Sequence, residues 1–272
     1  LMPIHSITLD IETFCELALK KTGVYPYALH PSFQILLVSL SVDGGPIQTY
    51  DLASGEKLPD EILRAIVDDH VIKYAFNANF ERVCLSSYIN QNYPEFHIGY
   101  GAPEDSVGGY LNPVSWRCDL VLSAYNGLPL SLAGVGEVLG FEKQKLSEGK
   151  DLVRYFSTPC KPTKVNGGRT KNTPFDSPDK WADFKKYNVR DVEVQIEIHD
   201  RLQRYPVIDA VWQEYIIDQT ICDRGIRIDQ RLVENAIKID ALTKDSITKR
   251  MKEITGLDNP NSVSQLKGWL SS

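Results

Sequence analysis

The sequence predicts an α/β domain followed by a helical extension. The chain opens with β-rich runs, and a short apolar run at residues 70 to 76 leads directly into a helical pattern, which together favour an α/β domain. From residue 207 onward, long helical patterns with charged faces replace this alternation. We therefore assign residues 1–204 to the α/β domain and residues 205–272 to the extension.

The first predicted strand, "SITLDIET", carries two carboxylates close together. Because side chains alternate along a strand, Ile7, Leu9 and Ile11 share one face and Asp10 and Glu12 share the other. The second face is either the solvated side of a half-buried strand or a metal site. Repulsion between two neighbouring carboxylates is relieved by a divalent cation with oxygen ligands, such as Mg²⁺ or Mn²⁺. The strand alone leaves both interpretations open.

The next elements follow from turn and cap signals. "SFQILLVSLSVDGGPIQTYDL" predicts two strands joined at Asp43-Gly44-Gly45, so the first three strands are expected to be antiparallel. Helical periodicity covers residues 58 to 67. Asn77 follows the strand at 70–76 and is a favourable start for the helix expected at 80–91. Further helices, broken by turn residues, are expected within 119–139, and a loop is expected over 157–178.

A long helix is predicted from Ser177-Pro178 to Arg204, with an apolar stripe that contains one charged residue. The stripe consists of Trp181, Phe184, Tyr187, Asp191, Val194, Ile198 and Leu202. An aspartate turned toward the core needs a partner, because an unpaired buried charge costs several kcal/mol. Asp191 is therefore either a structural residue, paired with a buried arginine or capping a neighbouring helix, or a metal ligand.

Composition excludes several classes of protein. No apolar run approaches the roughly 18 residues of a membrane helix, so we expect a soluble, cytoplasmic protein. The five cysteines are odd in number and widely spaced, which predicts reduced thiols and no zinc site. A net charge of −6 argues against coating of duplex nucleic acid by bulk electrostatics.

Three motifs in this order resemble those of the DEDD 3′-to-5′ exonucleases: "LDIET", the N-x-x-F-E of Asn77 to Glu81, and the Y-x-x-x-D of Tyr187 to Asp191. The resemblance is closest to the tyrosine-bearing subgroup that forms the proofreading domain of family A DNA polymerases. "SLAGVGEVLG" resembles the helix between the second and third motifs of that family. The tail from "ICDRGIRID" to "NSVSQLKGWL" resembles the beginning of the polymerase thumb. The resemblance implies the N-terminal part of a phage-type or prophage-type polymerase from a bacterial cell.

The family implies a ribonuclease H-like fold, in which helices cover both faces of a mixed five-stranded sheet and Asp10 and Glu12 lie on the central strand. It implies 3′-5′ exodeoxyribonuclease activity with two divalent metal ions, Mg²⁺ or Mn²⁺. Asp10 would bridge the ions, Glu12 and Asp191 would complete one site, and Glu81 would hold the second ion directly or through water. Tyr187 would hydrogen-bond the attacking water.

The implied substrate is the 3′ end of single-stranded DNA or of a primer-template, and the implied partner is the polymerase domain, whose palm and fingers motifs we do not find in this sequence. Asn77 and Phe80 are expected to shape the site. The segment from 143 to 171 is rich in lysine and arginine. It is either a solvated loop or a contact to the DNA backbone, for which the candidates are Lys161, Lys164, Arg169 and Lys171.

Glu81 departs from the family pattern, because the second motif usually ends in aspartate. The longer side chain would displace a ligand of Mg²⁺, whose octahedral geometry is strict. Two other functions therefore remain open. One is a catalytically weak or silent scaffold that positions primer-template for the polymerase. The other is an RNA-trimming exonuclease of the same superfamily, against which the thumb-like tail argues.

Overall fold

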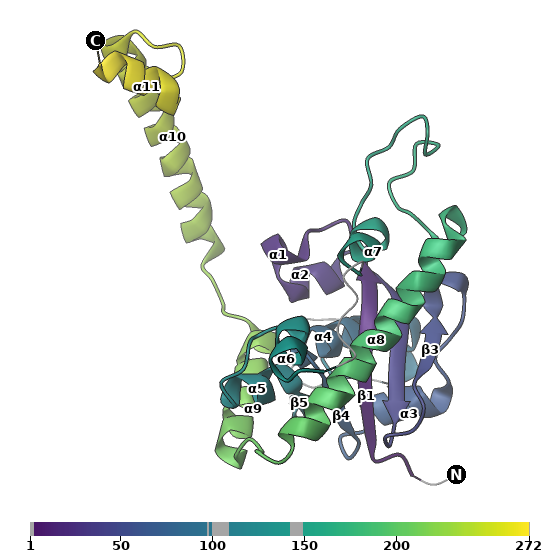
Figure 1. Cartoon of the computed structure of the whole chain (residues 1–272). Helices are drawn as coiled ribbons and strands as arrows, with labels where there is room; N and C mark the ends of the chain where they lie inside the picture. The colour runs from purple at the N-terminus through teal and green to yellow at the C-terminus, as the bar shows by residue number, and fades with distance from the viewer. Residues whose placement is uncertain (1–2, 97, 100–108, 142–148, 272) are drawn as a thin grey trace. The chain divides into compact units, whose positions relative to one another are not determined.

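The computed structural model of the protein describes residues 3–96, 98–99, 109–141 and 149–271. A five-stranded mixed sheet has the order β3-β2-β1-β4-β5 (Figure 1). The strands are β1 Ser6–Phe14, β2 Gln34–Val42, β3 Gln48–Asp51, β4 Ile72–Ala75 and β5 Trp116–Cys118. β2 is antiparallel to β1 and to β3, whereas β4 is parallel to β1 and to β5. The predicted ribonuclease H-like arrangement is confirmed, and β1 is its central strand.

One face of the sheet carries the main hydrophobic core. The side chains of Ile7, Leu9 and Ile11 are buried there, as the alternation along β1 predicts. Three helices contribute buried side chains to the same cluster: α2 Val24–Leu29, α3 Asp60–Val67 and α4 Ala78–Asn92. Each buried aliphatic side chain stabilises the fold by about 1.5–3 kcal/mol. This burial holds β1 in one register and turns its polar residues to the other face.

The other face of the sheet is covered by α8, Pro178–Leu202, which contacts β1 and β2. All seven members of the predicted stripe are buried, Asp191 included. Three shorter helices pack against α8: α5 Asp119–Tyr125, α6 Leu132–Val138 and α7 Gly149–Phe156. Helices therefore lie on both faces of the sheet, as expected (Figure 1).

Several short elements were not located from the sequence. These are α1 Leu19–Thr22, α2, α7 and β5, together with 3₁₀ helices at Leu52–Ser54, Pro94–Phe96, Pro113–Ser115 and Pro174–Asp176. A helix of four to eight residues or a strand of three is too short to display its characteristic period. Their positions are set by contacts with the rest of the fold, and such contacts leave no local pattern.

The helices of the extension are α9 Asp209–Arg224, α10 Gln230–Thr255 and α11 Val263–Leu270, within the region where long helical patterns were expected. The chain divides into two compact units after Arg224, so α9 packs with the first unit although we placed it in the extension. The second unit contains α10 and α11. Its assignment to a polymerase thumb stays a prediction. Among the described residues, no helix is both long enough and apolar enough to cross a membrane.

A buried arginine anchors α9 to α4. The guanidinium of Arg82 donates to the two carboxylate oxygens of Asp223 at 2.7 and 2.8 Å. It also donates to the carbonyl of Leu111 at 2.9 Å and to Oε1 of Gln219 at 3.2 Å. The hydroxyl of Tyr25 donates to Asp223 at 2.8 Å. These hydrogen bonds offset the desolvation of the ion pair. Arg82 directly follows Glu81 in the sequence.

Lys73 on β4 is buried, and its ammonium donates to the backbone carbonyl of Asp68 at 2.7 Å. Burial lowers its pKa from 10.5 to about 8, against the opposing charges of Asp69 and Asp68. At about 1.4 kcal/mol per pKa unit, keeping this group charged weakens the fold at pH 7. We therefore expect Lys73→Met to raise the free energy of unfolding by about 1–3 kcal/mol in urea titrations at pH 7.

The pH dependence provides the check on this prediction. Between pH 8 and 10.5 the unfolded chain binds more protons at Lys73 than the folded protein does, so Lys73 should contribute a rise of stability with pH in this window, against the fall contributed by buried thiols and phenols whose pKa values are raised. Lys73→Met should flatten that rise. Lys57→Met, at an exposed lysine, is the matched control and should change neither quantity. The prediction would be contradicted if Lys73→Met lowered the free energy of unfolding and left its pH dependence as in the wild type.

Candidate metal centre

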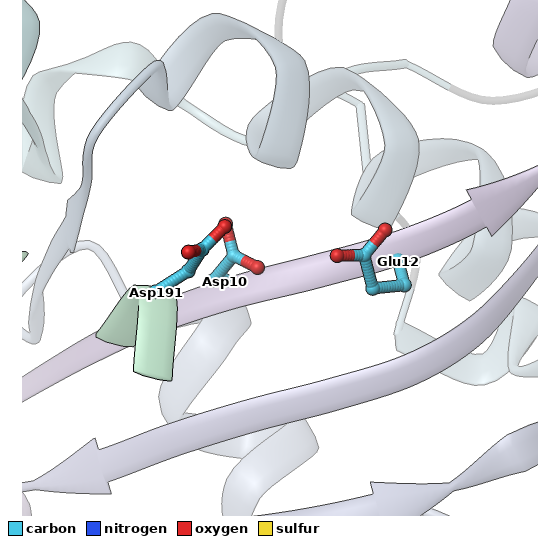
Figure 2. Close-up of side chains that lie close together, drawn as sticks. All are labelled: Asp10, Glu12 and Asp191. Atoms are coloured by element: carbon cyan, nitrogen blue, oxygen red, sulfur yellow. The ribbon is translucent and has the colours of Figure 1, made fainter. Parts of the chain in front are cut away.

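Three carboxylates converge between β1 and α8 (Figure 2). Asp10, Glu12 and Asp191 each offer an oxygen, and these oxygens lie within 4.8 Å of one another. Glu12 and Asp191 are buried and Asp10 is half-buried. Like charges at such distances repel, and a hard divalent cation with oxygen ligands removes the repulsion. The cluster is therefore suited to a divalent metal ion.

The sequence separates these residues widely, and the fold brings them together. Asp10 and Glu12 are two residues apart on β1, so both point to the face that α8 covers. Asp191 lies on the buried stripe of α8. Of the alternatives left open by the sequence, the position beside Asp10 and Glu12 favours a metal ligand.

Glu81 lies in the first turn of α4 and is buried. Its pKa is raised well above the usual value, first by burial and then by the negative charge of Asp10. Among the described residues, its Oε2 has no hydrogen-bond partner. A buried carboxylate oxygen without a partner is costly unless a ligand satisfies it. Glu81 is not one of the three carboxylates whose oxygens lie within 4.8 Å of one another. The effect of Asp10 on its pKa nevertheless shows that Glu81 interacts electrostatically with the same site.

Asn188 is a site residue that our sequence analysis missed. It is fully buried, and its side-chain amide donates to Oδ2 of Asp10 at 2.6 Å. Residues 188 and 191 are three apart and face the same side of α8. The three-residue spacing between Asn188 and Asp191 was the sequence signal that could have identified Asn188 as a site residue. The bond holds the Asp10 carboxylate toward α8, where it meets the carboxylate of Asp191.

Tyr187 is buried beside the same group. Its pKa is raised by burial and then by the charges of Asp191, Glu12 and Asp10, and its hydroxyl hydrogen-bonds with Asp191. The phenol therefore stays protonated and can act as a hydrogen-bond donor at the centre. Tyr187 lies one helical turn before Asp191 on the same face of α8, as the spacing in the sequence predicts.

The residues expected to shape the site occupy the end of α4 nearest Glu81. Asn77 is the N-cap residue of α4, but its exposed side chain makes no capping hydrogen bond. Phe80 is half-buried and lies with its ring 6.3 Å from that of Tyr27. The exposed amide of Asn77 is available to a ligand, whereas Phe80 belongs to the edge of the main core.

The four basic candidates fall into two pairs. Arg169 forms an ion pair with Asp176 at 3.2 Å and donates to Asn172 at 2.9 Å. Lys171 donates to Gln34 and lies over the ring of Phe14. Lys161 and Lys164 are exposed, and no ion pair is recorded for them within the described residues. The structure thus uses Arg169 and Lys171 to hold the loop. Residues 142–148, part of the basic segment, lie outside the described residues.

No protein-family model matches the chain. The DNA polymerase of Bacillus phage SP02 is 42% identical over 267 residues, which is 98% of this chain and 38% of that polymerase. The chain thus spans less than two fifths of this relative. The predicted resemblance to a phage DNA polymerase is confirmed.

Three solved structures align with this chain at low sequence identity. Escherichia coli RNase D, an exoribonuclease involved in structured RNA processing, aligns with a TM-score of 0.46 and 11% identity, over 82% of this chain and 46% of that chain. Brucella melitensis NrnC aligns with a TM-score of 0.40 and 11% identity, over 81% and 85%. The family B DNA polymerase of Pyrobaculum calidifontis aligns with a TM-score of 0.42 and 18% identity, over 72% and 24%.

Proposed function

We propose that this chain is the 3′-5′ exonuclease, or proofreading, part of a family A DNA polymerase that acts in the bacterial cytoplasm. Its reaction is hydrolysis of the 3′-terminal phosphodiester of single-stranded DNA. The observation that carries the proposal is the convergence of Asp10, Glu12 and Asp191, with Glu81 and Tyr187 beside them. The 42% sequence identity with a phage DNA polymerase supports the proposal that the chain is part of a polymerase.

Four carboxylates are available for two divalent ions, Mg²⁺ or Mn²⁺. Asp10 would bridge both, because it lies near Glu12 and Asp191 and its charge raises the pKa of Glu81. Glu12 and Asp191 would complete one site, and Glu81 would hold the other directly or through water. When bound, such ions lower the pKa of a water and neutralise the charge that develops on the attacking and leaving oxygens.

The protein's own groups orient the reactants around this centre. Tyr187 keeps its proton, and its hydroxyl would hydrogen-bond the attacking water. Asn188 fixes the carboxylate of Asp10. Asn77 and Phe80 would contact the terminal nucleotides, and Lys161 and Lys164 would contact the DNA backbone. If so, replacing both lysines reduces the salt dependence of DNA binding.

Glu81 supports a second candidate, a weak or silent exonuclease that serves as a scaffold for primer-template. Its carboxylate lies outside the close group of three oxygens. An ion held by Glu81 would then have an incomplete or displaced ligand shell, which Mg²⁺ tolerates poorly. The scaffold predicts normal folding and DNA binding with little hydrolysis.

The test is digestion of single-stranded DNA labelled at its 5′ end, with Mg²⁺ or Mn²⁺ and in EDTA. A ladder that shortens from the 3′ end with either metal, and not in EDTA, is the expected result. A matching RNA strand in parallel decides the sugar preference. Folded protein that produces no ladder favours the scaffold, and Glu81→Asp should then restore digestion.

Metal binding can be measured apart from hydrolysis. We expect millimolar Mg²⁺ or Mn²⁺ to raise the melting temperature of the wild-type protein, because a ligand that binds only the folded state stabilises it. The rise should be lost in Asp191→Asn, which removes one charge from the buried cluster. Asp183→Asn, at an exposed position on α8, is the control and should keep it. An equal rise in all three proteins would exclude the proposed site.

A further inference from the structure

Gly149, the first residue of α7, lies directly against the ring of Tyr187. It is buried, and a Cβ atom added to it would overlap Cδ2 and Cε2 of the ring and come within 2.9 Å of Cζ. Carbon atoms pack best at about 3.5–4.0 Å, so no side chain fits here without movement. The backbone of α7 thus reaches the ring only because residue 149 has no side chain.

The same helix supports the next ring of the stack. Phe184 is stacked on Tyr187, with the ring centroids 6.1 Å apart and an angle of 8° between the planes. Phe156, at the other end of α7, stacks on Phe184 at 5.2 Å. α7 therefore touches the row of rings at two places, Gly149 at Tyr187 and Phe156 at Phe184. The ring that carries the hydroxyl is held by packing as well as by its bond to Asp191.

Gly149 belongs to the α-helix α7, a conformation that residues with side chains also adopt, so the requirement for glycine there is one of space. Gly136 on α6 offers a comparison, since it is also buried in a helix that packs on α8. A Cβ at Gly136 would meet Cγ1 of Val194 at 3.6 Å, an ordinary contact. Gly149 therefore has no room for a side chain, whereas Gly136 has.

We propose that Gly149 is a positioning residue for the exonuclease reaction, because it lets the backbone of α7 press on the ring of Tyr187 and hold the hydroxyl at the carboxylates. The inference rests on the proposed function, in which Tyr187 orients the attacking water. Gly149 acts only through the tyrosine.

Gly149→Ala is expected to lower kcat on single-stranded DNA by about 10- to 100-fold, because a displacement near 1 Å can cost on the order of 100-fold. KM should stay within about twofold, since the DNA contacts are unchanged. Tyr187→Phe keeps the ring and removes the hydroxyl. In that background Gly149→Ala should lower kcat by no more than about twofold, because no hydroxyl remains to be displaced. Gly136→Ala, the matched control, should keep the wild-type kcat.

The outcomes separate the two proposals. Folded wild-type protein without exonuclease activity would overturn the proposed function. An active wild type with Gly149→Ala at the same kcat, or with an equal loss in the Tyr187→Phe background, would overturn the role of Gly149 alone. If Gly149→Ala does not fold, adding Tyr187→Leu removes the overlapping ring and should restore the melting temperature. Failure to restore it would mean that the contact with Tyr187 is not the cause.

Discussion

Asp10→Ala is expected to reduce hydrolysis of the 3′-terminal phosphodiester on the order of 1000-fold or more. Asp10 is the carboxylate common to the whole centre. It lies near Glu12 and Asp191, accepts the bond from Asn188 and raises the pKa of Glu81 by its charge. Removing it takes a ligand from both proposed ions. Metal-ion catalysis contributes several kcal/mol, and about 1.4 kcal/mol is a factor of ten in rate.

The measurement is the initial rate of ladder formation on 5′-labelled single-stranded DNA, with folding verified by thermal melting. Asp10→Ala also removes one of several crowded negative charges, so the metal-free variant should fold at least as well as the wild type. Asp183→Ala, at an exposed acidic position, should keep the wild-type rate. A folded Asp10→Ala within about tenfold of the wild-type rate would place the catalytic centre elsewhere.

Asp223→Ala is expected to cost about 3–5 kcal/mol of folding free energy, because it leaves a buried guanidinium without its counter-charge. Arg82 and Asp223 both have fully buried side chains, and their ion pair measures 2.7 Å. The lost carboxylate accepts from Arg82 through both oxygens and from the hydroxyl of Tyr25. Urea denaturation of the whole chain provides the measurement, and α9 should be the helix released first.

Two further variants test the cause of this loss of folding free energy. Arg82→Met with Asp223→Ala removes both charges and should recover part of the stability, because the desolvated charge is then gone. Asp183→Ala breaks the exposed pair with Lys186, whose side chains are 59% and 72% exposed, and should cost less than about 0.5 kcal/mol. A loss below about 1 kcal/mol in Asp223→Ala would show that the buried pair contributes little.

Much of the fold was predictable because its signals are local. Alternation along β1 predicted which face would carry Asp10 and Glu12, and the stripe of α8 predicted that Asp191 would point inward. Period 2 and period 3.6 describe how a residue relates to its near neighbours, so a single sequence contains them. The same local spacing placed Tyr187 one turn before Asp191. The metal and catalytic roles of these residues came from the family resemblance and stay predictions.

Tertiary structure alone decided which distant groups meet. Asn188 bonds Asp10 across 178 residues of sequence, and Arg82 bonds Asp223 across 141. The packing of Gly149 on Tyr187 likewise depends on where α7 lies against α8. No periodic pattern encodes such pairs, because each depends on the relative placement of whole elements. Local patterns therefore specified the longer elements and the faces of their carboxylates, whereas packing between elements positioned the short elements and selected the side chains that support the carboxylates.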